Sequence, residues 1–154
     1  MGYNKKALNK DRMESSVMEQ QSAGYREIEH TADWELQVWA PDFPGLLEHA
    51  ARGMYALAGV CLAEEPRHRK SIDLSAQDEE SLLIKFLEEL LYLGETEGLA
   101  FDSYRIRIEA GQLVAELSGA TLLQVSKEIK AVTFHNLAIR RMGRGLEVSI
   151  VFDV

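Results

Sequence analysis

Apolar side chains occupy every second position of residues 146–154, and of the four positions between them only Val151 is apolar. This pattern constrains the fold more than any other feature of the sequence. A spacing of two is the period of a β-strand that buries one face. Turn signals at Ala110-Gly111 and Gly143-Arg144-Gly145 predict antiparallel hairpins. A sheet with one apolar face must cover it with another layer. The same alternation recurs at residues 34–40, 71–74, 104–108 and 113–117.

Two other stretches carry apolar residues at helical spacing and supply that layer. The first covers residues 44–60, with a stripe from Leu46 to Ala58. The second covers residues 78–94; it starts with three acidic side chains, which suit a helix N-terminus, and Gly94 is expected to end it. The sequence therefore predicts an α+β fold, a compact single domain of antiparallel sheet or sheets with two main helices packed on one face.

The length and composition of the chain indicate one domain, preceded by a tail and without an intramolecular disulfide. The 154 residues, 46% of them apolar, fit one domain with an ordinary core. Residues 1–24 contain few large apolar side chains, so they are expected to form a disordered or weakly helical tail ahead of a domain at 25–154. The single cysteine, Cys61, rules out an intramolecular disulfide and is expected to be a small buried residue at the end of the first helix.

Charge and hydropathy limit the partners. A net charge of -8 argues against a uniformly basic nucleic-acid-binding domain. No run is long and apolar enough to span a bilayer, and the N-terminus has no apolar signal region. We therefore expect a cytoplasmic protein without a membrane partner.

Three stretches stand out as able to carry chemistry: residues 30–33, residues 130–135, and Asp153 beside Val154. Asp33 and Asp153 would converge if the last strand lies beside the early one. Two carboxylates with backbone and terminal oxygens would then bind a hard cation such as Ca²⁺ or Mg²⁺. The alternative is a turn aspartate and a solvated terminal one, and spacing alone favours that interpretation. Glycine-rich phosphate loops, serine nucleophile elbows and zinc-type histidine spacings do not occur.

Two basic clusters invite a phosphate-binding interpretation. One is residues 67–70, and the other holds Arg140, Arg141 and Arg144. The alternative is a solvated strand end and a soluble hairpin turn, which the acidic balance of the domain favours.

Three motifs together resemble the signatures of the archease family. Residues 25–33, Tyr-Arg-Glu-Ile-Glu-His-Thr-Ala-Asp, resemble its opening motif. Residues 130–137, Lys-Ala-Val-Thr-Phe-His-Asn-Leu, resemble its second signature, and residues 151–154, Val-Phe-Asp-Val, its terminal one. The intervening segment 43–54 fits as well. The three occur in the expected order, although residues 120–129 are more apolar than in many members.

The resemblance implies a function. Archeases are activating cofactors of the GTP-dependent tRNA-splicing RNA ligase; they promote its guanylylation and multiple turnover and are not enzymes themselves. The resemblance also implies a compact α+β fold and a divalent metal site, usually of calcium, with Asp33, Asp153 and Val154 as ligands. Lys130 and His30 would belong to the same functional patch.

Two alternative functions remain open. One is a general chaperone or modulator of nucleic-acid-processing proteins, and the other is a metal-dependent phosphohydrolase that uses the two aspartates. We expect no strong direct RNA binding, and we expect Arg140, Arg141 and Arg144 to contact the ligase or GTP phosphates instead.

Overall fold

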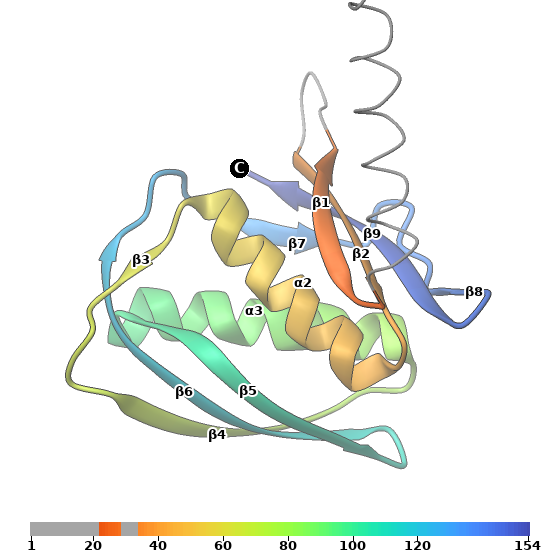
Figure 1. Cartoon of the computed structure of the whole chain (residues 1–154), viewed down its shortest axis with the longest axis horizontal. Coiled ribbons are helices and arrows are strands. Elements are labelled where there is room, and N and C mark those ends of the chain that lie inside the picture. Colours follow the sequence, from red (N-terminus) through yellow and green to blue (C-terminus); the bar gives the residue numbers. More distant parts are fainter. Residues whose placement is uncertain (1–21, 29–33) are drawn as a thin grey trace, which may run out of the picture.

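A computed structural model describes residues 22–28 and 34–154 of the chain (Figure 1). The predicted tail, residues 1–24, falls mostly outside the described residues, and the first strand begins at Gly24. Among the described residues, no helix is long and apolar enough to cross a membrane. The elements run in the order β1 (Gly24–Ile28), β2 (Trp34–Ala40), α2 (Phe43–Ala58), β3 (Cys61–Leu62), β4 (His68–Ser75), α3 (Glu79–Glu97), β5 (Leu99–Glu109), β6 (Gln112–Gln124), β7 (Ala131–Thr133), β8 (Arg140–Met142) and β9 (Gly145–Asp153).

The strands form two antiparallel sheets, and each is organised around one long strand. In the five-stranded sheet, the order is β1-β2-β9-β7, and β8 also pairs with β9. In the four-stranded sheet, β6 pairs with β3, β4 and β5. The predicted α+β class and antiparallel pairing are thus confirmed, with the strands divided between two sheets.

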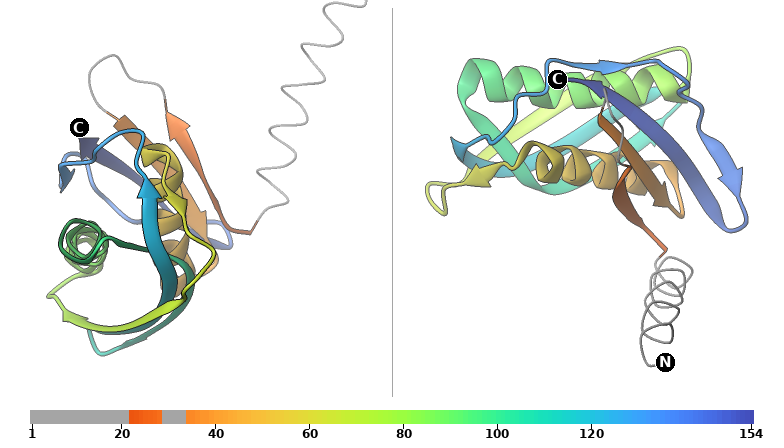
Figure 2. Two further views of the ribbon diagram at one scale, coloured as in Figure 1. Left: turned by 90° about the vertical axis from the view of Figure 1, so that its left-hand side faces the viewer. Right: turned by 90° about the horizontal axis from the view of Figure 1, so that it is seen from above.

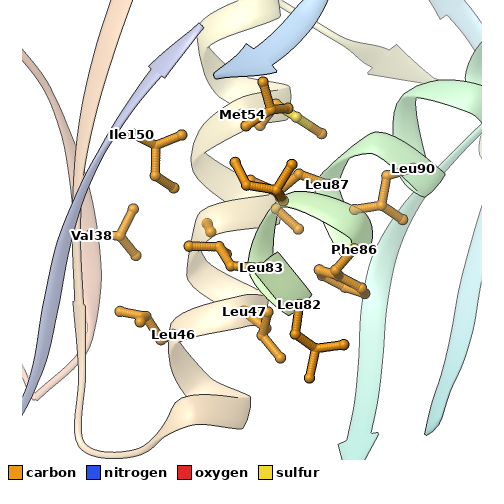
Figure 3. Close-up of a cluster of buried hydrophobic side chains, with 14 of the residues drawn as sticks. Val38, Leu46, Leu47, Met54, Leu82, Leu83, Phe86, Leu87, Leu90 and Ile150 are labelled. Atoms are coloured by element: carbon orange, nitrogen blue, oxygen red, sulfur yellow. The ribbon is translucent and has the colours of Figure 1, made fainter. Parts of the chain in front are cut away.

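Both helices lie between the sheets, so each sheet covers part of their apolar stripes (Figures 1 and 2). Helix α2 packs on β1 and β2 of the first sheet and on β5 of the second, whereas α3 packs on β4 and β5 and reaches β7. Fully buried side chains from α2, α3, β2 and β9 point toward one another in one core (Figure 3). The side chains that Figure 3 labels are Val38, Leu46, Leu47, Met54, Leu82, Leu83, Phe86, Leu87, Leu90 and Ile150.

Local side-chain chemistry sets the helix ends. The side chains of Asp42 and Asp78 accept hydrogen bonds from backbone N–H groups in the first turns, at 2.8 and 2.7 Å. Helix α3 does not end at Gly94, as the sequence predicted, but continues to Glu97. The end falls there because Gly98 takes up the left-handed conformation, with φ 66°, and its N–H donates to the Gly94 carbonyl at 3.1 Å.

The expectation for Cys61 is wrong. The thiol-bearing residue is exposed, because α2 ends at Ala58 and Cys61 lies in the short strand β3 at the edge of the second sheet. The helical stripe that suggested burial does not extend to it.

Candidate functional site at the end of strand β9

The end of β9 brings the second and third sequence signatures together. Ala131 of β7 pairs with Asp153 of β9, and the Lys130 N–H donates to the Asp153 carbonyl at 2.8 Å. Strand alternation places Asp153 on the face opposite the fully buried Phe152, so its carboxylate is exposed. Lys130 is exposed as well. A lysine and a carboxylate from separate signatures therefore share one corner of the sheet, where Figure 1 shows the end of β9 beside β7.

The first signature leads to the same corner. Trp34 directly follows Asp33 in the chain and pairs with Phe152 of β9. Ile28 pairs with Glu35 across β1 and β2. The residues on both sides of segment 29–33 are thus fixed at this end of the first sheet. His30 and Asp33 themselves lie outside the described residues, so their predicted roles stay predictions.

Residues 126–129, to which sequence reasoning assigned no functional role, connect this corner to helix α2. The N–H groups of Ser126 and Lys127 both donate to the Ala58 carbonyl, at 2.9 and 3.1 Å. The Lys127 ammonium lies over the Trp34 ring, 4.2 Å from its centroid. The polar residues at 126–128 that follow the apolar end of β6 were the available signal, but nothing in the sequence indicated that they contact Trp34.

The atoms at this corner that could bind a metal are oxygen atoms. Within residues 22–28 and 34–154, no group of three or more His, Cys, Asp or Glu side chains is placed to hold a metal. The described residues supply the exposed Asp153 carboxylate and the oxygen atoms of the half-buried Val154. Asp153 makes no side-chain hydrogen bond or ion pair with any other described residue. Free oxygen donors of this kind suit a hard cation and do not suit a soft one.

An apolar cavity of about 410 Å³ adjoins the corner. It lies between the C-terminal half of α2, helix α3 and residues 122–130, and Lys130 forms part of its wall. The other lining residues are Met54, Tyr55, Ala58, Val60, Leu90, Leu91, Gly94, Glu95, Leu122, Val125, Glu128 and Ile129.

Tyr55 also borders a second, smaller cavity of about 250 Å³, beside Tyr104 and Arg52. Burial raises the pKa of both tyrosine hydroxyls above the ordinary value. The Tyr104 hydroxyl donates to the Phe101 carbonyl at 2.6 Å. The backbone of Phe101 opposes the effect of burial on the Tyr55 pKa. By distance and angle, the buried Tyr55 hydroxyl has no hydrogen-bond partner among the described residues. Both phenols therefore stay neutral at physiological pH.

The three arginines of the C-terminal hairpin do not join the corner. Arg140 pairs with Glu147 near the start of β9, roughly 20 Å along the strand from Asp153 at about 3.4 Å per residue. Arg140, Arg141 and Arg144 are all exposed, and none forms an ion pair with a described residue. They are available to a partner, but at a place separate from Lys130.

Comparison with known proteins identifies the family. The model of the archease protein family matches residues 25–154. An archease of Thermococcus gammatolerans is 32% identical over 129 residues, which cover 79% of this chain and 91% of the relative. An archease of Methanosarcina barkeri is 32% identical over 146 residues, which cover 89% of this chain and all of the relative.

Solved structures share the fold. The solution structure of a Methanobacterium thermoautotrophicum protein, 24% identical, superposes with a TM-score of 0.66 over 85% of this chain and 99% of its own. A Thermotoga maritima crystal structure, described as that of "an archease, possible chaperone", is 26% identical and has a TM-score of 0.63 over 84% of this chain and 96% of its own. On the match of the family model and the identity of these relatives, the chain belongs to the archease family.

Proposed function

We propose that this chain is a protein cofactor of the GTP-dependent tRNA-splicing RNA ligase, which it activates in the cytoplasm by promoting guanylylation and multiple turnover. Family membership supports the proposal. The observation that carries it is the hydrogen bond between the Lys130 N–H and the Asp153 carbonyl at 2.8 Å. This bond brings two family signatures together at one corner of the sheet. Lys130 and Asp153 are exposed there, so the hydrophobic core does not explain why these residue types occur.

The chemistry of this corner suits such a role. Guanylylation is a phosphoryl transfer, and its catalysis depends mainly on positioning and on neutralising phosphate charge. The exposed Lys130 ammonium is a point charge that can hold a phosphate oxygen. The chain would supply this group to the ligase and would need no turnover of its own.

We further propose that Asp33, Asp153 and Val154 hold one divalent cation, Ca²⁺. The exposed and unpaired Asp153 carboxylate supports this assignment, because it is free to act as a ligand. Hard oxygen donors are what Ca²⁺ requires, usually with six to eight in total, so waters or the partner would complete the set. When bound, the ion would supply positive charge that attracts phosphate oxygens.

The activity test measures transfer of labelled GMP from GTP to the purified ligase, with and without this chain. We expect stimulation by the unaltered chain and loss of stimulation with Lys130→Ala and Asp153→Asn. Glu109→Gln is the matched control, because Glu109 is an exposed carboxylate at the β5–β6 turn of the other sheet. No stimulation by the unaltered chain, or full stimulation by both variants, would overturn the proposal.

The metal test uses Tb³⁺, a luminescent substitute for Ca²⁺. Trp34 pairs beside the end of β9 and should sensitise a bound Tb³⁺, whereas Trp39 pairs with Glu147 near the other end of that strand. We expect Ca²⁺ to displace the Tb³⁺ signal, Asp153→Asn to weaken it, and Trp34→Phe to remove it while calorimetry still shows Ca²⁺ binding. Trp39→Phe should keep it. Unchanged Tb³⁺ affinity in Asp153→Asn would contradict the assigned ligands.

A chaperone role is the second candidate, because the Thermotoga maritima structure carries that description and because large apolar side chains such as Leu123 and Phe134 are exposed at 67% and 59%. Its test is suppression of the aggregation of an unrelated unfolded protein. Suppression without stimulation of the ligase would favour this candidate over the first.

A further inference from the structure

The cavity of about 410 Å³ beside Lys130 is large enough for more than one aliphatic side chain, and its walls are mostly apolar. Met54 of α2 and Leu90 of α3 line the cavity, and both are fully buried. Val125 lines the cavity while 43% of its surface remains exposed, so the cavity reaches the surface there. An apolar hollow that opens to solvent is a place where another apolar group gains by binding.

The charges at the opening indicate what kind of group fits. Glu95 and Glu128 line the cavity and are exposed, and neither makes an ion pair or hydrogen bond with a described residue. Lys130 is the only cation among the lining residues. Two unpaired carboxylates beside an apolar hollow complement an apolar side chain that has a basic neighbour.

The cavity adjoins the Lys130–Asp153 corner, which is the functional site in the proposal above. Lys130 lines the cavity, and its backbone N–H is bonded to Asp153 at 2.8 Å. The segment that lines one side of the cavity is bonded to α2, because the N–H groups of Ser126 and Lys127 donate to the Ala58 carbonyl at 2.9 and 3.1 Å. A partner whose active site meets the Lys130–Asp153 corner would therefore lie next to the cavity wall that Lys130 forms.

We propose that this cavity receives an apolar side chain from a peptide segment of the ligase, and that a Lys or Arg next to it in that segment binds between Glu95 and Glu128. The proposal rests on the proposed function for the identity of the partner. It adds an anchoring pocket beside the functional corner, where the apolar contact supplies affinity and the charge pair sets orientation.

The test compares two aspartate substitutions in one segment. Val125→Asp places a charge in the cavity wall, whereas Leu123→Asp places one two residues earlier, at a side chain that is 67% exposed and does not line the cavity. We expect Val125→Asp to weaken ligase binding about tenfold or more by calorimetry. Leu123→Asp should bind the ligase as the unaltered chain does.

A second substitution fills the cavity without adding a charge, so the proposal can still be tested if Val125→Asp does not fold. A Cβ at Gly94 would meet only the Leu99 carbonyl oxygen at 3.5 Å and a Leu122 methyl at 3.8 Å, both ordinary contacts. Gly94 lines the cavity, so Gly94→Met should fill it, keep the chain folded and weaken ligase binding. The double charge reversal Glu95→Lys with Glu128→Lys should also weaken binding and reduce its salt dependence.

The outcomes separate the two proposals. If the unaltered chain neither binds nor stimulates the ligase, both fail. If it stimulates the ligase while Val125→Asp and Gly94→Met bind with unaltered affinity, only the pocket fails. Self-association of the chain that Val125→Asp abolishes in sedimentation would also overturn the pocket proposal, because the occupant would then be a second copy.

Discussion

Two tyrosines side by side have opposite hydrogen-bonding states. Tyr104 donates to the Phe101 carbonyl at 2.6 Å, whereas the buried Tyr55 hydroxyl has no hydrogen-bond partner in the described part of the chain. A buried polar group without a partner costs free energy, while a satisfied one contributes about 1 kcal/mol. Tyr55 lines two cavities, and phenylalanine would pack there equally well. Packing alone therefore does not explain why this position has a hydroxyl.

We therefore predict opposite results for the two phenylalanine substitutions. Tyr104→Phe should lower the free energy of unfolding by about 1 kcal/mol, because it leaves the Phe101 carbonyl unpaired. Tyr55→Phe should leave it unchanged or raise it slightly, because no bond is lost. Urea unfolding measures both. A loss in Tyr55→Phe as large as in Tyr104→Phe would show that the Tyr55 hydroxyl has a partner.

At the scale of the element, two glycines inside helices differ in the space around them. Gly53 of α2 leaves no room, because a Cβ there would lie 2.6 Å from a Leu36 methyl and 2.8 Å from the Tyr25 ring. Gly94 of α3 has right-handed backbone angles and only ordinary contacts around the position of a Cβ. The first glycine serves close packing against the sheet, whereas the second does not.

Alanine at these two positions should act in opposite directions. Gly94→Ala should raise the free energy of unfolding by about 0.5–1 kcal/mol, since glycine is that much less favourable than alanine in a helix interior. Gly53→Ala should lower it by about 1–3 kcal/mol through overpacking. Thermal and urea unfolding would check both, and stabilisation by Gly53→Ala would contradict the packing seen here.

The glycines that end the two helices form another matched pair. Gly59 and Gly98 both have left-handed φ angles, 65° and 66°. A Cβ at Gly98 would meet nothing within 4 Å, while one at Gly59 would lie 2.6 Å from the Ser126 hydroxyl oxygen. The end of α2 is thus packed against the segment that reaches Lys130. The end of α3 has space for a Cβ, although the Gly98 carbonyl accepts a hydrogen bond from the Leu122 N–H at 2.8 Å.

Alanine at each C-cap should separate backbone strain from this contact. Gly98→Ala should cost about 1–2 kcal/mol, the strain of a left-handed alanine. Gly59→Ala should cost more, and amide exchange at Ser126 and Lys127 should accelerate, because their bonds to Ala58 are disturbed. Equal costs with unchanged exchange would mean that Ser126 simply moves aside.

At the scale of the whole molecule, the sequence predicted the strands and helices whose apolar residues recur at a regular spacing. It did not predict which strands, far apart in the sequence, pair with one another. Residues 146–154 alternate because β9 buries one face, and the two helical stripes face one core. The last strand and both helices were therefore predicted, although α3 continues past Gly94. The division into two sheets is not visible in a local pattern. It arises because β9 inserts between β2 and β7, and β6 between β4 and β5.

The site shows the same limit. The resemblance assigned Lys130 and Asp153 to one functional region, and the structure places the two residues side by side through the bond from the Lys130 N–H to the Asp153 carbonyl. Their functional roles stay predictions. The role of Lys127 beside Trp34 and the adjoining cavity were missed, because they depend on where segment 122–130 crosses α2. Gly94 was mistaken for a helix end because glycine alone does not distinguish an interior from a cap.

The distribution of charge over the molecule leads to a prediction about RNA. The net charge is -8, and two of the cationic side chains in the basic cluster at residues 67–70 are paired within the fold. Arg67 forms an ion pair with Asp102 at 2.5 Å, and Lys70 forms one with Glu97 at 2.6 Å. Among the described residues, the three unpaired arginines of the β8–β9 hairpin form one exposed basic group that is available to phosphates.

Three arginines release few counterions, so we expect the isolated chain to bind a tRNA half with a Kd on the order of 10⁻⁵ M or weaker at physiological salt. Filter binding across a salt series measures this affinity and its slope. Changing Arg140, Arg141 and Arg144 to Ala should alter RNA affinity little but slow association with the ligase if its surface there is acidic. Sub-micromolar RNA binding that the triple substitution abolishes would instead show that this chain holds RNA directly.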